Sequence, residues 1–228
     1  MNTAAPPAAA SAPAIAAILL AAGAGRRLGG RPKGLLQRDG QPLLARQIEL
    51  LAQAGAGQIV AVLGHHAAAY LPVLQAERQR LPDGLLRWTH NPDPDGPGGV
   101  AASLRCGLAQ LPPAIPTVLV ALLDQPLLQA ADARALLRAW AKRPPHIDLL
   151  APVYQGQPGH PVIFGPTLRQ AIERQTGAGG VRQWRQDHPD RVQLLPVNHP
   201  RHTRDVDCPA DLAALAAEHG VELRWPQA

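Results

Sequence analysis

Short apolar runs alternate with segments of helical periodicity along most of this chain, and the alternation limits the folds available to it. The runs AAILLA (16–21), QIVAVLG (58–64) and TVLVALLD (117–124) lack the polar alternation of a half-exposed strand. Strands that are apolar throughout are typical of sheets covered on both faces. We therefore predict an α/β fold with a doubly wound, mostly parallel sheet.

The rest of the chain continues this pattern. We expect further strands near 85–91, 148–154, 161–165 and 192–197, and helices near 42–54, 66–80, 99–111, 129–142, 166–175 and 209–219. Pro42 suits a first helical turn, whereas Pro72 is expected to limit or kink its helix. A chain of 228 residues is long enough for one large core. We predict a single domain over 14–228, behind a disordered Ala/Pro-rich tail at 1–13.

The charge balance favours small anionic ligands over nucleic acid. Lys and Arg outnumber Asp and Glu by 22 to 17, a net charge of +5, and aromatic residues make up 3% of the chain. A basic surface attracts anions, but few aromatic side chains are available to stack on bases. A nucleic-acid binder is kept as a rival, and salt-sensitive DNA binding would be its signature.

The cysteines and the N-terminal residues bear on the compartment. Cys106 and Cys208 lie far apart and match no disulfide or zinc pattern. The first residues lack the basic region of a secretory signal, and no apolar run is long enough to span a membrane. We expect a protein of the reducing cytoplasm, with no membrane partner.

A glycine-rich, basic loop follows the first apolar run. The stretch LLAAGAGRRLGGRPKG (19–34) places Arg26, Arg27, Arg31 and Lys33 within eight residues. Glycines allow a backbone to approach a phosphate closely. A plain turn needs the glycines but not the cations, whose mutual repulsion calls for an anionic partner.

Two common phosphate-binding motifs do not fit this loop. The dinucleotide fingerprint requires a third glycine where Leu28 stands, and an acid at the end of the second strand, which reads Leu63-Gly64-His65. The Walker A motif requires Ser or Thr after the lysine, but Gly34 follows Lys33. These mismatches disfavour both a nicotinamide enzyme and a P-loop NTPase.

Polar residues follow other predicted strands as well. Asn91 comes after the third strand and Asp124 after the fourth. In doubly wound sheets, ligands bind outside the carboxyl ends of the strands. We therefore expect these residues to share one site with the glycine-rich loop.

The ordered motifs resemble a known family. LAAGAGRRLGG (20–30), PKGLL (32–36) and GQPLL (40–44) are similar to the nucleotidyltransferase signature, most closely that of the molybdenum cofactor cytidylyltransferases, whose group includes the guanylyltransferases. The resemblance continues through NPDPDGPGGVAASLRCGL (91–108), LLDQPLL (122–128), GHPVIF (159–164) and RDVDCPADL (204–212). It covers about residues 15 to 215 and implies a Rossmann-like nucleotidyltransferase fold.

The resemblance implies an activity and a cofactor. CMP would be transferred from CTP, or another NTP, to a molybdopterin-type phosphorylated pterin with release of pyrophosphate, in the presence of Mg²⁺. Because an acceptor phosphate is already ionised near neutral pH, positioning and charge neutralisation suffice for catalysis. A molybdenum hydroxylase or its maturation factor is an open further partner.

The resemblance also assigns roles to residues. Arg26 and Lys33 are expected to neutralise the phosphates and Asp124 to hold the metal, as the catalytic residues. Asp207 is implied as a second metal ligand, for which Asp205 is a substitute. The nucleotide-binding residues are expected to be Leu20, Ala21, Ala22, Gly23, Gly25, Arg26, Lys33, Asn91 and Ser103. His160 and Pro161 are expected on the acceptor side.

Structural interpretations of these residues stay open. Asp124 is alternatively a turn or helix-cap residue, and Asp207 a cap of the terminal helix. Asn91 and Ser103 are equally compatible with turns and caps, and His160 with an ordinary surface position.

Two departures from the family pattern bear on function. Leu123 stands before the metal aspartate, where the family usually has a small residue, and 176–184 lacks an acid common in cytidylyltransferases. A non-catalytic nucleotide-binding module is therefore a rival, as is transfer to another acceptor, such as a sugar or alditol phosphate. Ala22 favours CTP over GTP, because the guanylyltransferases usually have glycine there and an extra methyl group narrows a base pocket.

Overall fold

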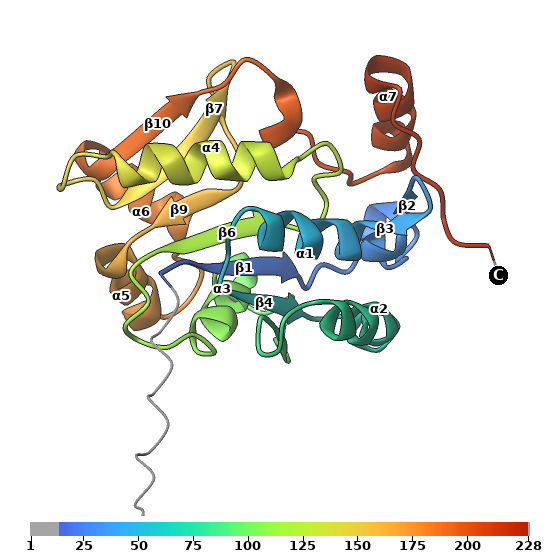
Figure 1. Cartoon of the computed structure of the whole chain (residues 1–228), viewed down its shortest axis with the longest axis horizontal. Coiled ribbons are helices and arrows are strands. Elements are labelled where there is room, and N and C mark those ends of the chain that lie inside the picture. The colour runs from blue at the N-terminus through green and yellow to red at the C-terminus, as the bar shows by residue number, and fades with distance from the viewer. Residues whose placement is uncertain (1–13, 228) are drawn as a thin grey trace, which may run out of the picture.

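Strand β1 (Ala16–Ala21) lies inside the main sheet, as its uninterrupted apolar sequence predicts (Figure 1). The computed structural model describes residues 14–227, and the tail predicted at 1–13 lies outside them. The sheet has eight strands in the order β10-β7-β9-β6-β1-β4-β5, with β8 paired to β7. The other strands are β4 (Gln58–Leu63), β5 (Leu86–His90), β6 (Val118–Leu122), β7 (Leu149–Tyr154), β8 (Gln157–Pro158), β9 (Val162–Phe164) and β10 (Val192–Pro196).

Most neighbouring strands of this sheet run parallel. β1 is parallel to both β4 and β6, with Leu19 opposite Ala61 and Ala121. The pairs β4–β5 and β7–β10 are parallel too, whereas β9 is antiparallel to both β6 and β7. The prediction of a mostly parallel sheet is confirmed.

Helices cover both faces of the sheet, because successive residues of β1 point to opposite sides. Leu19 packs in a cluster with α1 (Leu43–Gln53), α2 (Ala67–Arg80) and α4 (Ala130–Ala141). Ile18 packs on the other face with α3 (Gly99–Leu108), α5 (Pro166–Arg174) and α6 (Val181–Asp187). The predicted doubly wound α/β architecture is confirmed. Within residues 14–227, no helix combines the length and the apolar character needed to cross a membrane.

A third, smaller apolar cluster lies beyond the carboxyl ends of β1 and β6. It joins helix α7 (Pro209–His219) to the loops that follow these strands and to the last described residues of the chain. Its buried members are Leu28, Leu36, Leu43, Leu127, Val206, Leu215 and Val221. This cluster therefore holds the glycine-rich loop and the C-terminal region together.

Several local details differ from the sequence expectations. Pro42 precedes α1, because its extended backbone pairs in the short strand β3 (Gln41–Pro42) with β2 (Gln37–Arg38). Helix α2 runs through Pro72 without a break, and buried Tyr70 and Leu74 pack this helix on the core. Helix α3 ends at Leu108 rather than near 111. The sequence does not predict α6, whose seven residues are too few for a helical period to stand out.

Candidate active site

The glycine-rich loop after β1 turns back on itself at Gly25. This residue has φ 64°, and its carbonyl oxygen accepts hydrogen bonds from the backbone N–H groups of Leu28 (2.9 Å) and Gly30 (3.0 Å). A β-carbon at position 25 would collide with the carbonyl oxygen of Arg31. Because glycine alone tolerates both constraints, the loop keeps its backbone amides and its cations at the carboxyl end of β1.

Lys33 joins two carboxylates that are distant in the sequence. It lies in the short 3-10 helix η2 (Lys33–Leu35), and its Nζ donates to Asp124 Oδ2 at 3.1 Å. The same ammonium contacts the carboxylate of Asp207. The Lys33 side chain is only 14% exposed. The structure thus brings together the loop lysine and the aspartates of two later motifs.

The charge of Lys33 is well defined in this group. Burial lowers the pKa of Lys33, but the negative charges and hydrogen bonds of Asp124 and Asp207 outweigh it, and the net pKa is raised above 10.5. Lys33 is therefore a cation throughout the physiological range. Its charge offsets the repulsion between the two aspartates, which face the same point from different loops.

Asp205 lies beside this group but is held by a different residue. The buried side-chain amide of Gln125 donates to Asp205 Oδ1 (2.9 Å) and to the carbonyl oxygen of His202 (2.8 Å). Burial, and next the charge of Asp124, raises the pKa of Asp205 to about 6. Direct contact with the lysine distinguishes Asp207 from Asp205 as the partner of Asp124. The sequence resemblance assigns no role to Gln125. Its position directly after Asp124 in the LLDQPLL segment is the only sequence feature that points to a place near the site.

The two carboxylates that Lys33 joins do not cap helices. Helix α4 begins after Gln129 with a capping box completed by Asp132. Helix α7 begins after Cys208, and Asp211 completes its capping box. Asp211 Oδ2 also accepts a hydrogen bond from the backbone N–H of Asp207 (2.8 Å). The cap interpretation is therefore wrong for Asp207, whose side chain faces the lysine instead.

The two adjacent arginines of the loop contact acids on opposite sides. Arg27 Nη2 donates to Asp207 Oδ2 at 2.6 Å. Arg26 pairs with Asp95, on the loop after β5, and His65 Nε2 lies 3.0 Å from the same carboxylate. Arg26, the arginine expected at the phosphates, thus lies toward the β5 side. Arg27, which is not among the site residues expected from the sequence, donates to one of the aspartates instead, although it stands in the same run of cations and at the second arginine of the glycine-rich motif.

Asn91 and Ser103 hydrogen-bond to each other. Asn91 Nδ2 donates to Ser103 Oγ at 3.0 Å, and Asn91 Oδ1 accepts from the backbone N–H of Asp93 at 3.1 Å. The two residues are 3% and 4% exposed. They tie the loop after β5 to α3, which supports the turn interpretation of Asn91.

The first residues of the loop pack against the end of β4. Ala22 is 8% exposed, and a β-carbon on Gly64 would lie 2.8 Å from the Ala22 methyl group and 2.5 Å from the Ala22 carbonyl oxygen. Ala21 is buried as well, whereas a β-carbon on Gly23 would meet nothing within 4 Å. The Ala22 methyl group therefore sits where the ends of β1 and β4 meet, and Gly64 makes room for it.

A cavity of about 750 Å³ opens between α3 and α6, next to Leu20 at the end of β1. Apolar side chains form much of its wall, and Val100 at the start of α3 is 70% exposed. Arg182 and Arg185 of α6 add positive charge. The cavity therefore combines apolar surface with cations, and its basic wall belongs to the helix that the sequence does not predict.

His160 lies between this cavity and the carboxylates. It lines the cavity and also a smaller one of about 410 Å³, which it shares with Gln125 and Asp205. Burial, followed by the charge of Arg185, lowers the pKa of His160 to about 4, so the ring is neutral at pH 7. Pro161 follows it, buried, through a cis peptide bond. His160 lines two cavities rather than open surface.

Leu123, the bulky residue before Asp124, packs in the core. It is 6% exposed and belongs to the apolar cluster on the α1 and α2 side of the sheet. A β-carbon on Gly34 would lie 3.1 Å from Leu123 and 2.9 Å from Tyr70. The Tyr70 hydroxyl also accepts a hydrogen bond from the backbone N–H of Gly34 at 3.1 Å. Leu123 thus occupies the core beneath Gly34 rather than the space around the carboxylates.

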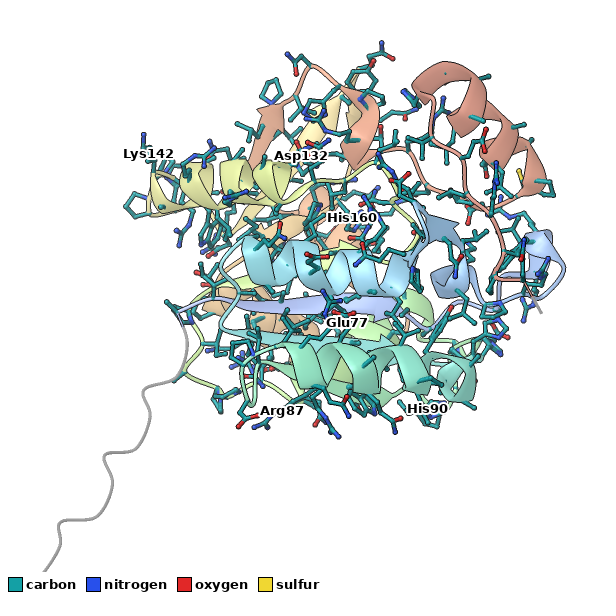
Figure 2. The ribbon with its side chains drawn as sticks, turned by 45° about the vertical axis from the view of Figure 1, so that its right-hand side comes forward. Glu77, Arg87, His90, Asp132, Lys142 and His160 are labelled. Carbon is teal, nitrogen blue, oxygen red and sulfur yellow. The ribbon has the colours of Figure 1, made fainter. Side chains whose placement is uncertain are left out.

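A second group of metal-ligating residue types lies at the start of α4. Asp132, His199 and His202 bring ligand atoms within 4.8 Å of one another. Arg201 donates to both oxygens of Asp132 at 2.8 Å, and His202 Nδ1 lies 2.9 Å from the carbonyl oxygen of His160. Figure 2 shows Asp132 and Lys142 toward opposite ends of α4, with His160 on the same side as Asp132. The guanidinium of Arg201 already neutralises the Asp132 carboxylate, so this group needs no metal ion to balance its charge.

The chain is similar to a family of known proteins over most of its length. Residues 17–192 match the family model of the MobA-like NTP transferase domain. Two relatives cover most of the chain and carry different names. Nicotine blue oxidoreductase of Paenarthrobacter nicotinovorans is 31% identical over 204 residues, 86% of this chain and 93% of that protein. The molybdenum cofactor guanylyltransferase of Pseudomonas aeruginosa (strain LESB58) is 32% identical over 189 residues, 81% of this chain and 82% of that protein.

A solved structure shares the fold at somewhat lower identity. Rv0371c from Mycobacterium tuberculosis H37Rv superposes with a TM-score of 0.72 at 29% identity, covering 91% of this chain and all of that one. A second structure of Rv0371c, described as a complex with manganese, gives a TM-score of 0.65 at 26% identity over 88% of this chain and 97% of that one. The similarity therefore extends beyond the sheet to nearly the whole described chain.

Proposed function

The chain belongs to the MobA-like NTP transferase family and is a nucleotidyltransferase, and we propose that it transfers CMP from CTP to a molybdopterin-type phosphorylated cofactor. In this reaction an oxygen of the acceptor phosphate attacks the α-phosphorus of CTP, and pyrophosphate leaves. One observation carries the proposal: Lys33 of the glycine-rich loop contacts both Asp124 and Asp207. A cationic loop and two carboxylates at the end of the sheet are what a metal-bound triphosphate requires.

The carboxylates suit a divalent cation. Asp124 and Asp207 supply oxygen ligands, which Mg²⁺ and Mn²⁺ prefer, and Rv0371c is described in complex with manganese. A cation between them would neutralise phosphate charge as the pyrophosphate leaves. We propose Mg²⁺ as the physiological cation. Asp205, whose Oδ1 is engaged by Gln125, is the weaker candidate ligand.

The cations of the loop would bind the phosphates of the NTP. Lys33 is placed to contact a phosphate oxygen that enters between Asp124 and Asp207, and Arg27 lies on the other side of Asp207. Arg26 pairs with Asp95 in a largely exposed contact, which a phosphate of higher charge would displace at low cost. The backbone of Leu20 to Gly25 would lie along the nucleotide, as the tight turn at Gly25 permits.

Two features support the choice of base and acceptor. The Ala22 methyl group fills the space against Gly64, which leaves less room for a purine than glycine would. The cavity beside His160 offers apolar walls with Arg182 and Arg185, a combination that suits a flat heterocycle carrying a phosphate. Ser103 and Asn91 would then act by holding the wall of the nucleotide site rather than by touching the base.

The setting of the reaction is part of the proposal. We propose that 14–228 form one domain, because one sheet draws strands from Ala16 to Pro196. The family's chemistry and the basic surface favour a small anionic substrate in the cytoplasm over nucleic acid or a membrane. A molybdenum hydroxylase or its maturation factor would receive the product.

The relative named as an oxidoreductase defines the main rival. A hydride-transfer enzyme would bind a dinucleotide at the glycine-rich loop. Two aspartates gathered around one lysine serve no purpose in hydride transfer, whereas nucleotidyl transfer uses them. The loop also lacks the third glycine and the acid of the dinucleotide fingerprint. These features favour nucleotidyl transfer for this chain.

The test is pyrophosphate release with each of the four NTPs, with Mg²⁺ or Mn²⁺, in the presence of the molybdopterin acceptor or of sugar and alditol phosphates. We expect turnover with CTP and the pterin, and loss of turnover on chelation. Equal turnover with GTP would contradict the choice of base, and turnover with an alditol phosphate instead would contradict the acceptor. NTP binding without pyrophosphate release would indicate a binding module. In a parallel assay without NTP, hydride transfer from NADPH to an added electron acceptor, together with no NTP turnover in the first assay, would favour the oxidoreductase.

A further inference from the structure

Near its C-terminal end the described chain passes beside the β2–β3 hairpin that follows the glycine-rich loop (Figure 1). The backbone N–H of Gln37 donates to the carbonyl oxygen of Arg224 at 2.7 Å, and the N–H of Arg224 donates to that of Gln37 at 3.0 Å. These two hydrogen bonds pair Arg224 with Gln37, which lies four positions after Lys33. A strand-like pairing therefore anchors the C-terminal segment to β2, just after the glycine-rich loop.

Trp225 makes a second contact with the loop. The guanidinium of Arg31 lies 3.8 Å from the centroid of the Trp225 ring, a cation–π geometry. Arg31 is also the residue whose carbonyl oxygen abuts Gly25, where the loop turns. A side chain that fixes Arg31 thus fixes the turn at Gly25. Unlike Arg26, Arg27 and Lys33, Arg31 contacts no acid at the candidate site within the described residues. Its contact with Trp225 accounts for its position in the loop.

Apolar packing joins the same parts. Val221 is buried in the third cluster, and Leu223 and Trp225 pack against it. The cluster also contains Leu28 of the glycine-rich loop and Val206, which lies between Asp205 and Asp207. One small core therefore supports the loop, the carboxylate segment and the C-terminal segment together.

We propose that the C-terminal segment 221–225 is a positioning element for the phosphate-binding loop, and that Trp225 acts on it through Arg31. The segment lies outside the region 17–192 that matches the family model. The proposal rests on the proposed function only for the identity of the ligand, an NTP. Trp225 does not touch the reacting atoms; it sets the shape of the loop that binds the phosphates.

The test compares Trp225→Ala and Trp225→Phe with a matched control, Trp88→Ala. Trp88 is also faced by an arginine, Arg78 of α2, at 4.8 Å, but it lies on the edge strand β5 of the main sheet, whereas the C-terminal segment pairs with the separate two-stranded sheet. The first readout is amide hydrogen exchange of residues 22–36 in the ligand-free protein. The second is the split between KM for CTP and kcat.

We expect faster exchange over 22–36 in Trp225→Ala, and a KM for CTP raised about two- to fivefold, the factor an exposed cation–π contact is worth. The kcat should change little, and Trp225→Phe, which keeps a ring, should stay near the unmodified protein. Loop exchange that is unchanged in Trp225→Ala, or raised equally in Trp88→Ala, would overturn the proposal. A chain that turns over no NTP would count against the proposed function, while exchange in the ligand-free protein still decides the positioning role.

Discussion

Lys33 Nζ lies 3.1 Å from Asp124 Oδ2, although the two residues are 91 positions apart. The contact connects the loop after β1 with the loop after β6, two strands that pair directly in the sheet. Asp207 reaches the same ammonium from the segment before α7. The parallel sheet thus delivers the cation and one carboxylate to the same edge, and the C-terminal region adds the other carboxylate.

Replacing Lys33 with methionine should lower the stability of the protein and increase the stabilisation that a bound divalent cation provides. Without the ammonium, Asp124 and Asp207 repel each other in a partly buried site, and we expect a loss of about 1–2 kcal/mol in the free energy of unfolding in EDTA. A divalent cation would then replace the missing charge. Thermal unfolding with and without Mg²⁺ or Mn²⁺ measures both effects, with Lys33→Arg as the control that keeps the charge. An equal metal-induced shift in Tm in all three proteins would contradict this view of the site.

Asp124→Asn should abolish turnover while leaving the fold intact. The amide keeps the shape of the side chain but loses the charge that holds a divalent cation. We expect kcat to fall by more than about a hundredfold, the size of effect that follows from losing a charge-stabilising group, with an unchanged circular dichroism spectrum. Asp95→Asn, which alters the partly exposed contacts of that carboxylate with Arg26 and His65, is the matched control. A nearly normal rate in Asp124→Asn would show that this carboxylate does not hold the metal.

The elements of the sheet could be predicted because their sequences depend on burial alone. The apolar residues of β1 and β6 are almost all buried, and apolar runs of this length that end in a loop are typical of strands buried on both faces. The short elements could not be predicted for the opposite reason. Helix α6 has seven residues and depends on the burial of Trp184, and the β2–β3 pairing depends on a two-residue register.

The candidate site also has residues that could be predicted from the sequence and residues that could not. Lys33, Asp124 and Asp207 could be placed together because the strand ends and the ordered motifs point to one edge. Arg27, Gln125 and the basic residues of α6 depend on side-chain directions and on loop packing, which a sequence pattern does not contain. The pairing of Asn91 with Ser103 likewise needs the loop after β5 to be folded against α3.

Ala22→Gly should relax the choice of base. The Ala22 methyl group packs against Gly64, so its removal enlarges the space at the ends of β1 and β4. One methyl group in a pocket discriminates about tenfold or more, and we expect the ratio of kcat/KM for CTP over GTP to fall by about that factor. An unchanged ratio would show that another residue selects the base.

Gly64→Ala tests the same contact from the other side. The added β-carbon would lie 2.8 Å from the Ala22 methyl group and would also press on the backbone of Ala22. The loop must therefore shift, and we expect a higher KM for every NTP without a change in preference. Gly165→Ala, just before α5 and outside the proposed nucleotide site, is the control for an added methyl group, because the nearest atom to its β-carbon, on Trp140, would lie 3.5 Å away. Equal KM values for the two variants would contradict the prediction.

His160 should make the protein less stable in mild acid. Burial, and then the charge of Arg185, lowers the pKa of His160 from 6.5 to about 4 in the folded protein. Between these pH values the unfolded chain binds the proton and the folded one does not, so stability is present above pH 6.5 and is lost as the pH falls toward 4. We expect a loss of about 2 kcal/mol at pH 5 relative to pH 7.5 from this residue. Urea unfolding of His160→Gln should show a smaller loss, and equal losses in the two proteins would contradict the assignment.

Tyr70→Phe should loosen the attachment of Lys33 to the core. The Tyr70 hydroxyl accepts the backbone N–H of Gly34, the residue after Lys33, and burial raises the pKa of Tyr70 to about 12, so the hydroxyl stays neutral. Phenylalanine fills the same space but leaves a buried N–H without an acceptor, which costs about 1–3 kcal/mol. We expect lower stability by this amount and a reduced kcat/KM, because η2 carries the ammonium that joins the two carboxylates. Tyr154→Phe, at a partly exposed position on β7, is the control. If Tyr70→Phe unfolds at the same urea concentration as this control, the hydrogen bond does not hold the lysine in place.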